Sequence, residues 1–224
     1  IVAILENHQQ ADGSIVVPAA LLMLVSFLVE GGAAAAGWTA YPPLSAVKAA
    51  IPGSGLGQTL WLLGMALFIV SFTLGGLNYV VTVLNLRAHG MSMMRLPMTT
   101  WTLFISAVIG LLSFPPLTAA AIMLLLDREA GTSFYLTSGL VFSNTVQPHA
   151  GGSPLLWQHL FWFLGHPEVY VLVLPAIGVA FDVLAPMVRR PAFGYRASVI
   201  SLWIVAALSM AVWGHHMYVS GMNP

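Results

Sequence analysis

The chain has 224 residues, of which 58% are hydrophobic and only 6% are charged, and its formal net charge is zero. A soluble domain carries about a quarter charged residues, so this composition excludes an ordinary water-soluble fold and indicates a membrane protein. A chain without net charge gives no reason to expect a nucleic-acid partner. No cysteine is present, which excludes thiolate metal sites, iron–sulfur clusters and disulfides. Histidine and carboxylate side chains are the strong metal ligands that remain.

Residues 1–14 differ from the rest of the chain, because Glu6 to Gly13 is a polar stretch. We expect this segment to lie on the outer face of the membrane. The chain begins with Ile1 and shows no signal-peptide pattern, so we expect it to be an internal piece of a longer protein. Residues 15–224 are expected to form one transmembrane domain.

Five apolar stretches are long enough to cross a bilayer as helices of about 20 residues. Turn and breaker residues lie between them, and none shows the alternating polar pattern of a β-barrel strand. We therefore expect an all-α fold, a polytopic transmembrane helical bundle. The five spans are predicted at 15–38, 57–86, 98–126, 155–187 and 197–220.

The basic residues predict how the bundle is oriented. The connections that follow the second and fourth spans alternate with the others, so both lie on one side of the membrane. By the positive-inside rule this side is the cytoplasm, or the matrix for a mitochondrially encoded chain. These two connections carry five of the seven Lys and Arg residues: Arg87, Arg95, Arg189, Arg190 and Arg196.

Ionisable residues inside a span are costly and indicate function by default. The fourth span contains His166, and the fifth contains His215 and His216. At about 1.5 Å of rise per residue, His166 lies roughly 32 Å from the inner end of its span and His215 roughly 27 Å from the inner end of its own. The three histidines can therefore meet at one level, in the outer half of the membrane.

Three imidazoles without a thiolate suit copper or zinc, and a three-histidine site leaves one coordination position open for a substrate. Adjacent residues on a regular helix point about 100° apart. His215 and His216 can therefore share a metal only if it lies between their directions or if the helix is distorted there. Buried histidines that are hydrogen-bonded within the bundle are the alternative interpretation.

Other residues around His166 also indicate a site. Pro167 removes a backbone hydrogen bond inside the fourth span and clashes with the carbonyl of Phe163. Tyr170 follows His166 by four residues and shares its helix face. Glu168 lies on another face and deeper, and a carboxylic acid kept from water tends to stay protonated. Glu168 is therefore a candidate proton donor, with a purely structural buried acid as the alternative.

Four stretches of this chain resemble one known family. The stretch from Trp157 to Tyr170 resembles the sixth-helix signature of subunit I of A-type haem–copper terminal oxidases, and Val212–Met217 resembles the copper motif of the seventh helix. Glu30–Leu44 is similar to the end of the third helix and the loop after it, and Arg190–Tyr195 to the loop between the sixth and seventh helices. The similarity runs from about residue 15 to the end, and covers the third to seventh of the family's twelve helices.

This resemblance implies an oxidoreductase of the cytochrome c oxidase type in the respiratory chain, which reduces oxygen to water at a haem–copper centre and pumps protons. It implies copper (CuB) as a cofactor, held by His166, His215 and His216. Trp162 and Trp213 would bind the cofactors by packing beside the centre.

The resemblance also assigns roles to two catalytic residues. Tyr170 would be cross-linked to His166 and would supply an electron and a proton during cleavage of the O–O bond. Glu168 would pass protons from the inner route to the site or to the pumping branch. The expected surroundings are membrane lipid, other oxidase subunits including the electron-entry subunit, and cytochrome c or quinol as the electron donor. The expected location is the bacterial cell inner membrane, with the mitochondrial inner membrane as the alternative.

The chain lacks parts that the family has. Two haems belong to the full subunit, but the helices that carry their axial histidines are absent here, as is the lysine-bearing proton route. Residues 1–14 do not resemble the family, so His8 receives no haem role. The piece alone is expected to be inactive. The alternatives are an inactive truncated fragment and a proton-coupled membrane transporter that uses Glu168 and the histidines as a proton relay.

Overall fold

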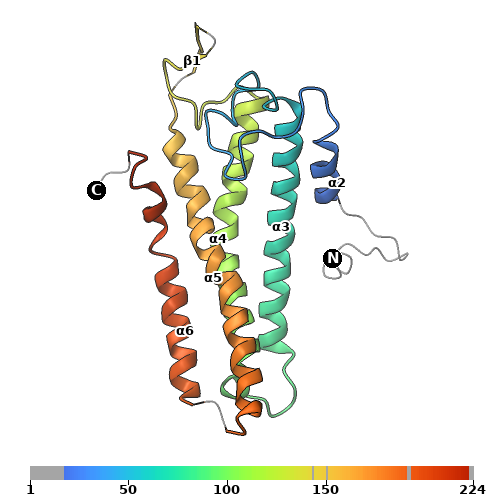
Figure 1. Cartoon of the computed structure of the whole chain (residues 1–224), viewed down its shortest axis with the longest axis vertical. Coiled ribbons are helices and arrows are strands. Elements are labelled where there is room, and N and C mark those ends of the chain that lie inside the picture. The colour runs from blue at the N-terminus through green and yellow to red at the C-terminus, as the bar shows by residue number, and fades with distance from the viewer. Residues whose placement is uncertain (1–17, 143, 150, 191–192, 222–224) are drawn as a thin grey trace. The chain divides into compact units, whose positions relative to one another are not determined.

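The computed structural model describes residues 18–142, 144–149, 151–190 and 193–221, so the predicted polar segment 1–14 lies outside the described residues (Figure 1). Helices make up most of what is described. The long ones are α3 (Leu56–Asn85), α4 (Met98–Glu129), α5 (Pro154–Met187) and α6 (Tyr195–Ser209).

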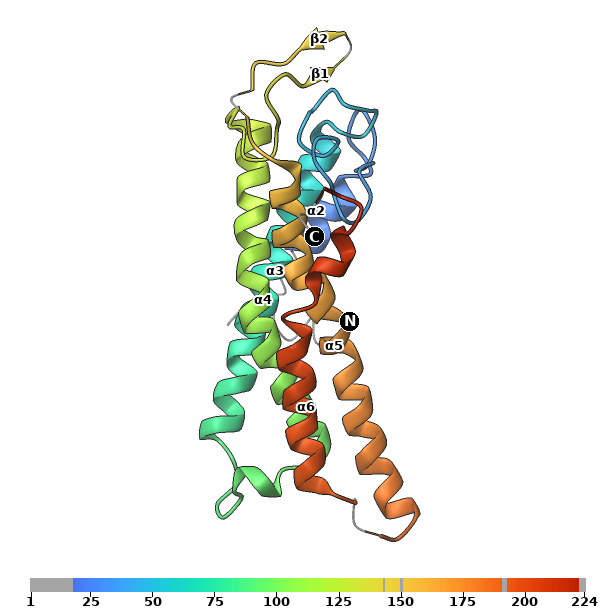
Figure 2. The same cartoon turned by 90° about the vertical axis from the view of Figure 1, so that its left-hand side faces the viewer.

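The remaining elements are short. They are α2 (Pro18–Val25), the 3-10 helices η1 (Met93–Arg95) and η2 (Trp213–Met217), and the strands β1 (Val141–Phe142) and β2 (Thr145–Val146). The two strands pair antiparallel as a hairpin in the connection between α4 and α5 (Figure 2).

Four helical segments of the described chain are long and apolar enough to cross a membrane: Leu56–Asn85, Met98–Glu129, Pro154–Met187 and Tyr195–Met217. A helix satisfies its own backbone hydrogen bonds, which is the condition for crossing a hydrocarbon layer that offers no water. The prediction of an all-α, multi-pass membrane bundle is confirmed.

The expected number of five spans is wrong for the described residues. In the described part of the predicted first span, residues 18–38, the one helix is the eight-residue α2, which ends at Val25. After Val25 the chain continues in turns, and Gly31, Gly32 and Gly37 have φ angles of +89°, +86° and +71°, so the helix is not resumed across them. A residue in this left-handed region cannot continue a right-handed helix. Hydropathy alone therefore overestimated the length of the helix in this segment.

The chain divides into two compact units. The first takes in the described residues of 1–71, 117–161 and 220–223, and the second those of 72–116 and 162–219. The boundary between the units falls inside α3, α4 and α5. All the residues that the sequence assigns to a metal or proton role belong to the second unit.

A buried arginine organises the first unit. The guanidinium of Arg128, near the end of α4, donates hydrogen bonds to the backbone carbonyls of Ser45, Ser54 and Gly55 and to the hydroxyl of Thr59. The carbonyls of Ser45 and Ser54 belong to an irregular segment without a regular helical ladder to donate hydrogen bonds to them, and buried backbone groups need partners. Arg128 therefore fastens the segment between α2 and α3 to the end of α4.

The connection that follows α4 is fastened by the neighbouring Asp127. Its carboxylate accepts hydrogen bonds from the backbone N–H groups of Phe134 and Tyr135, both at 2.8 Å, and from the Thr132 hydroxyl. The Tyr135 ring is fully buried and meets Trp157 edge-on, with ring centroids 5.5 Å apart. Burial, together with the charge of Asp127, raises the pKa of Tyr135. The start of α5 is thus fixed within the first unit.

The second unit has an apolar core made by α3, α4, α5 and α6. Leu174 of α5 and Leu202 of α6 are buried in it with Ile105 of α4. A polar contact closes its edge: the Trp101 indole N–H donates to the Tyr195 hydroxyl at 2.9 Å, and this hydroxyl donates to the carbonyl of Leu96 at 2.6 Å. The buried polar groups of this corner are therefore paired, as a water-free environment requires.

The start of α4 is capped by another helix. The Asp182 carboxylate of α5 accepts hydrogen bonds from the N–H groups of Met98 at 3.0 Å and Thr99 at 2.8 Å. This carboxylate pairs the free N–H groups of the first turn of α4, as an N-cap side chain usually does. One turn earlier on α5, Gly178 lies so close that a Cβ would be 2.1 Å from the Thr102 Oγ1. A glycine is therefore needed where these two helices cross.

We expect Gly178→Ala to destabilise the protein by about 1–3 kcal/mol, because the added methyl group must displace α4. The matched control is Gly75→Ala in α3, where an added Cβ meets nothing within 4 Å. Alanine there is expected to be neutral, or to stabilise by up to about 1 kcal/mol, because it is the better helix former. The thermal unfolding midpoint of the complete membrane complex that contains this chain measures both. Equal midpoints for the two variants would contradict the close helix crossing.

Candidate metal centre

The helix that carries two of the three predicted metal ligands ends before it reaches them. Helix α6 stops at Ser209. The backbone then makes i→i−3 hydrogen bonds, with Ala211 N–H donating to Leu208 at 2.9 Å and His215 N–H to Val212 at 3.3 Å. Figure 2 shows the ribbon of α6 interrupted toward the C-terminal end of the chain. His215 and His216 lie after this break, in the 3-10 helix η2. Of the two conditions under which adjacent histidines can share a metal, the structure contains the distorted helix.

The structure brings the three histidines together within the second unit. The ring centroid of His166 lies 4.6 Å from that of His215 and 5.8 Å from that of His216, and the last two are 4.1 Å apart. One nitrogen from each ring lies within 4.8 Å of the other two. The depth estimate from the span boundaries therefore placed these side chains at the same level correctly.

The unpaired nitrogens of this cluster fit a metal ion. The Nε2 atoms of His166 and His216 are buried and have no hydrogen-bond partner in the part of the chain that the structure describes. Buried polar atoms are normally paired, and both of these atoms belong to rings of the three-histidine cluster. Soft-to-intermediate divalent metals are the partners that imidazole nitrogens prefer. A copper or zinc ion bound in this cluster would be a suitable partner for both atoms.

The third ring is oriented by the backbone. The Nδ1 of His215 contacts the carbonyl oxygen of Val212. A carbonyl only accepts hydrogen bonds, so Nδ1 carries the proton and Nε2 keeps its lone pair. This is the arrangement by which metal-binding histidines are usually held in one tautomer. His215 is therefore ready to bind a metal through Nε2 although its ring is exposed.

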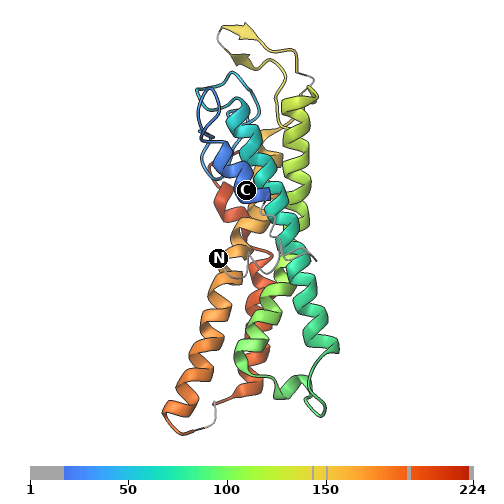
Figure 3. The ribbon, with the colours of Figure 1, turned by 90° about the vertical axis from the view of Figure 1, so that its right-hand side faces the viewer.

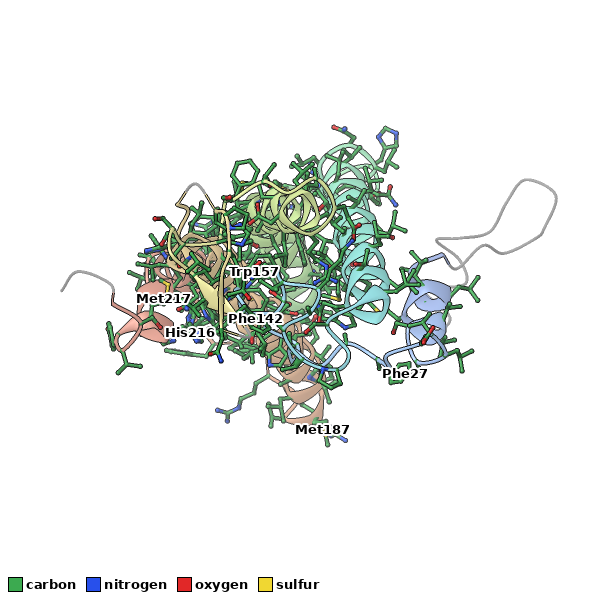
Figure 4. All side chains as sticks on the ribbon, turned by 90° about the horizontal axis from the view of Figure 1, so that it is seen from above. Phe27, Phe142, Trp157, Met187, His216 and Met217 are labelled. Carbon is green, nitrogen blue, oxygen red and sulfur yellow. The ribbon has the colours of Figure 1, made fainter. Side chains whose placement is uncertain are left out.

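An aromatic plane fixes His216. The Trp162 ring of α5 stacks on the His216 ring with centroids 3.7 Å apart and planes within 3° of parallel. Figure 4 labels His216 beside Met217, which is fully buried. Trp213 packs edge-on against Phe163, with ring centroids 5.4 Å apart. One tryptophan named by the sequence thus contacts a histidine of the cluster directly, and the other packs on the helix that carries His166.

Tyr170 and Glu168 occupy different positions relative to the cluster. The Tyr170 ring lies 5.0 Å from the His166 ring, at an angle of 54°, and packs against the apolar core of the second unit. Glu168 is half-buried and does not join the histidines; it makes no ion pair or hydrogen bond with another described residue. Helix α5 continues through Pro167 from Pro154 to Met187. The structure therefore places the tyrosine at the cluster and leaves the carboxyl group free on α5.

Sequence reasoning missed several features that build this centre. The stacking of Trp162 on His216 depends on side-chain rotamers and has no signal in the sequence. The contact of His215 with the Val212 carbonyl depends on the 3-10 geometry of η2. The Asp182 cap had a weak signal: Leu96 and Pro97 precede α4, so that helix has no N-capping side chain of its own. His89, His149 and His159 do not belong to the cluster of the described chain.

The fold and the cluster together define a multi-pass membrane protein with a preformed three-histidine site suited to a metal. Comparison with known sequences agrees with this class. The family model described as "Cytochrome C and Quinol oxidase polypeptide I" matches residues 4–224. The chain belongs to this family, subunit I of the haem–copper terminal oxidases, as its motifs predicted.

Individual relatives support the same family. The chain is 51% identical over 206 residues to "Alternative cytochrome c oxidase subunit 1" of Bradyrhizobium diazoefficiens, covering 92% of this chain and 34% of the relative. It is 46% identical over 199 residues to "Cytochrome c oxidase subunit 1" of Corynebacterium glutamicum, covering 89% and 32%. A protein of the same name from Eremothecium gossypii is 38% identical over 206 residues, covering 92% and 36%. The chain spans about a third of the length of these relatives.

We expect His166→Asn and His216→Asn each to lower the affinity of the complete complex for copper at least about tenfold, and so to lower the copper content of the purified complex. Loss of a ligand costs no less than loss of an outer-shell partner, which costs 10–100-fold. Elemental analysis, normalised to protein, measures the copper. His89→Asn is the matched control, because His89 lies outside the cluster. Full copper content in both ligand variants would show that the three histidines do not hold the metal.

Proposed function

We propose that this chain forms part of the catalytic subunit of a proton-pumping terminal oxidase, with His166, His215 and His216 as the ligands of the copper at the oxygen-reducing centre. The observation that carries the proposal is the convergence of three imidazoles with two buried, unpaired Nε2 atoms. These atoms lie at the positions that match the copper motifs of the family. Family membership favours this function over the transporter alternative.

The chemistry that bound copper would supply, together with a haem iron, is the delivery of electrons to oxygen. The contribution of this chain is to keep the ligands in place before the metal arrives. Trp162 holds His216 by stacking, and the Val212 carbonyl holds His215 by its contact with Nδ1. Preorganised ligands lose little conformational freedom when a metal binds. No described residue is assigned as a haem ligand; in the family these ligands lie on helices outside this chain.

Tyr170 is proposed to act beside the metal as a source of a proton and an electron. Its ring lies next to that of His166, one helical turn along α5. Because the tyrosine also packs in the core of the second unit, its position is fixed relative to the histidine. The covalent link between these two rings, which the resemblance implies, is part of this proposal.

Glu168 is proposed to carry protons to the centre. It lies on the same helix as His166, two residues away, and no basic side chain of the described chain pairs with it. An acid without a permanent partner in a low-dielectric region can take up and release a proton without first breaking an ion pair. This makes it suited to a transfer role rather than to a structural one.

The partners and the location complete the proposal. The relatives that the chain matches carry the name cytochrome c oxidase subunit 1, and the family description names both cytochrome c and quinol oxidases. We propose cytochrome c as the final electron donor, with quinol as the alternative, and other oxidase subunits and lipid as neighbours. The proposed location is the bacterial cell inner membrane, in keeping with the Bradyrhizobium and Corynebacterium relatives.

The experiment that tests the proposal is low-temperature infrared spectroscopy of the reduced, CO-bound complete complex, before and after photolysis. We expect light to move CO from haem iron to copper, which requires both metals at one centre. A His216→Asn complex should keep the haem-bound CO band and lose the copper-bound one. A native complex that shows neither band would overturn the oxidase function.

We expect Glu168→Gln to lower oxygen consumption by about 10²-fold or more while the copper content stays unchanged, because proton delivery by a positioned acid contributes 10²–10⁴-fold. An oxygen electrode and elemental analysis give the two readouts. Glu30→Gln is the matched control, since Glu30 is an exposed carboxyl in the first unit. Undiminished turnover in the Glu168→Gln complex would leave this carboxyl without a role in proton transfer.

A further inference from the structure

The start of α3 is a buried helix end in the first unit. The segment that follows α2 passes beside it, as Figure 3 shows in blue at the upper end of α3. A Cβ on Gly57 would collide with the carbonyl oxygen of Gly32 and would lie 3.2 Å from that of Ser26. No side chain fits between these two backbones, so the first turn of α3 is covered by main chain on this side.

The backbone N–H groups of this turn are only partly paired. The N–H of Thr59 donates to the Gly55 carbonyl at 3.4 Å, but those of Gly57 and Gln58 have no acceptor among the described residues. A helix leaves its first N–H groups free, and a side chain at the N-cap usually accepts their hydrogen bonds. Helix α3 begins at Leu56, so its N-cap is Gly55, which has no side chain. This buried helix end therefore lacks the usual cap.

The Gln58 side chain supplies a second, independent observation. It is fully buried, and neither its Nε2 nor its Oε1 has a hydrogen-bond partner in the described part of the chain. Gln58 is the third residue of α3, and a glutamine at this position reaches back toward the N-cap. Its amide is therefore directed to the same helix end as the unpaired N–H groups. Because this side chain is enclosed by the chain itself, neither lipid nor another subunit reaches it.

These groups determine what they can bind. The two N–H groups and the Gln58 Nε2 donate hydrogen bonds, whereas Oε1 accepts them. A cation is disfavoured by the positive end of the helix dipole and by the Arg128 guanidinium, which lies 2.8 Å from the Gly55 carbonyl oxygen. An anion only accepts hydrogen bonds and would leave Oε1 unpaired. A water molecule accepts and donates, and buried waters typically make about three hydrogen bonds to such groups.

We propose that the N-terminus of α3 binds an internal water molecule in place of a capping side chain. The water would accept a hydrogen bond from the N–H of Gly57 or Gln58 and donate one to the Gln58 Oε1. There is room at the N-cap, because no atom lies within 4 Å of where a Cβ on Gly55 would be. Together with Arg128, which binds the carbonyls of Ser54 and Gly55, the water would fix the start of α3 within the first unit.

The direct test is a cryo-electron-microscopy map of the complete complex that contains this chain, at a resolution that shows ordered water. We expect a peak within about 3.2 Å of the Gln58 amide and of the N–H of Gly57 or Gln58. The Gln58→Leu complex should lack this peak. A native map without the peak, or with a protein segment in its place, would overturn the proposal. So would anomalous scattering at the peak in crystals grown with bromide, because the ligand would then be an anion.

The thermal unfolding midpoint of the same complex tests what the water does. We expect Gln58→Leu to lower it by roughly 2–4 °C, because loss of the water leaves buried N–H groups unpaired. Adding Gly55→Ser should restore the midpoint, since a serine oxygen at the N-cap accepts from the same N–H groups.

Gly55→Ala in the Gln58→Leu background is the matched control, because it adds the Cβ without the oxygen and should restore nothing. Equal midpoints for the serine and alanine double variants would contradict a capping role. A Gln58→Leu complex more stable than the native one would show that the native amide is unpaired, and would overturn the proposal.

Discussion

Two adjacent residues on a regular α-helix point about 100° apart, and the metal centre of this protein depends on how that constraint is met. Helix α6 ends at Ser209, six residues before His215. The 3-10 helix that follows brings the two rings within 4.1 Å of each other. The break gives up i→i−4 hydrogen bonds inside a membrane, where unpaired backbone groups are costly. The i→i−3 bonds of the same segment recover part of them.

A segment with fewer backbone hydrogen bonds needs support from elsewhere, and the described structure supplies it from α5. Trp162 covers one face of His216, and Phe163 packs against Trp213. His166 stands on the same helix, which continues unbroken through Pro167. Helix α5 thus carries one ligand, His166. The same helix also packs against η2, the segment that carries His215 and His216. This division of roles explains why the residues around His166 are so largely aromatic.

The sequence predicted those parts of the fold that depend on composition and chain length. Hydropathy located four spans because burial in lipid requires long apolar stretches whatever their tertiary contacts. It failed at residues 15–38, because α2 ends at Val25 and the chain cannot resume a helix across the positive φ angles of Gly31 and Gly32, which an apolar average does not register. The meeting of His166 with His215 followed from counting residues along two spans. The stack of Trp162 on His216 and the cap of Asp182 on α4 did not, because both depend on how two helices cross.

The crossing of α5 with the start of α4 also limits how α5 can move as a whole. His166 and Arg190 are 24 residues apart in sequence, and between them Asp182 and Gly178 fix α5 to the start of α4. A charge–dipole contact and a backbone approach too close for a Cβ leave little freedom for α5 to slide or rotate. The position of His166 therefore depends on the contacts that fix α5 to the start of α4 as well as on the residues beside its own ring.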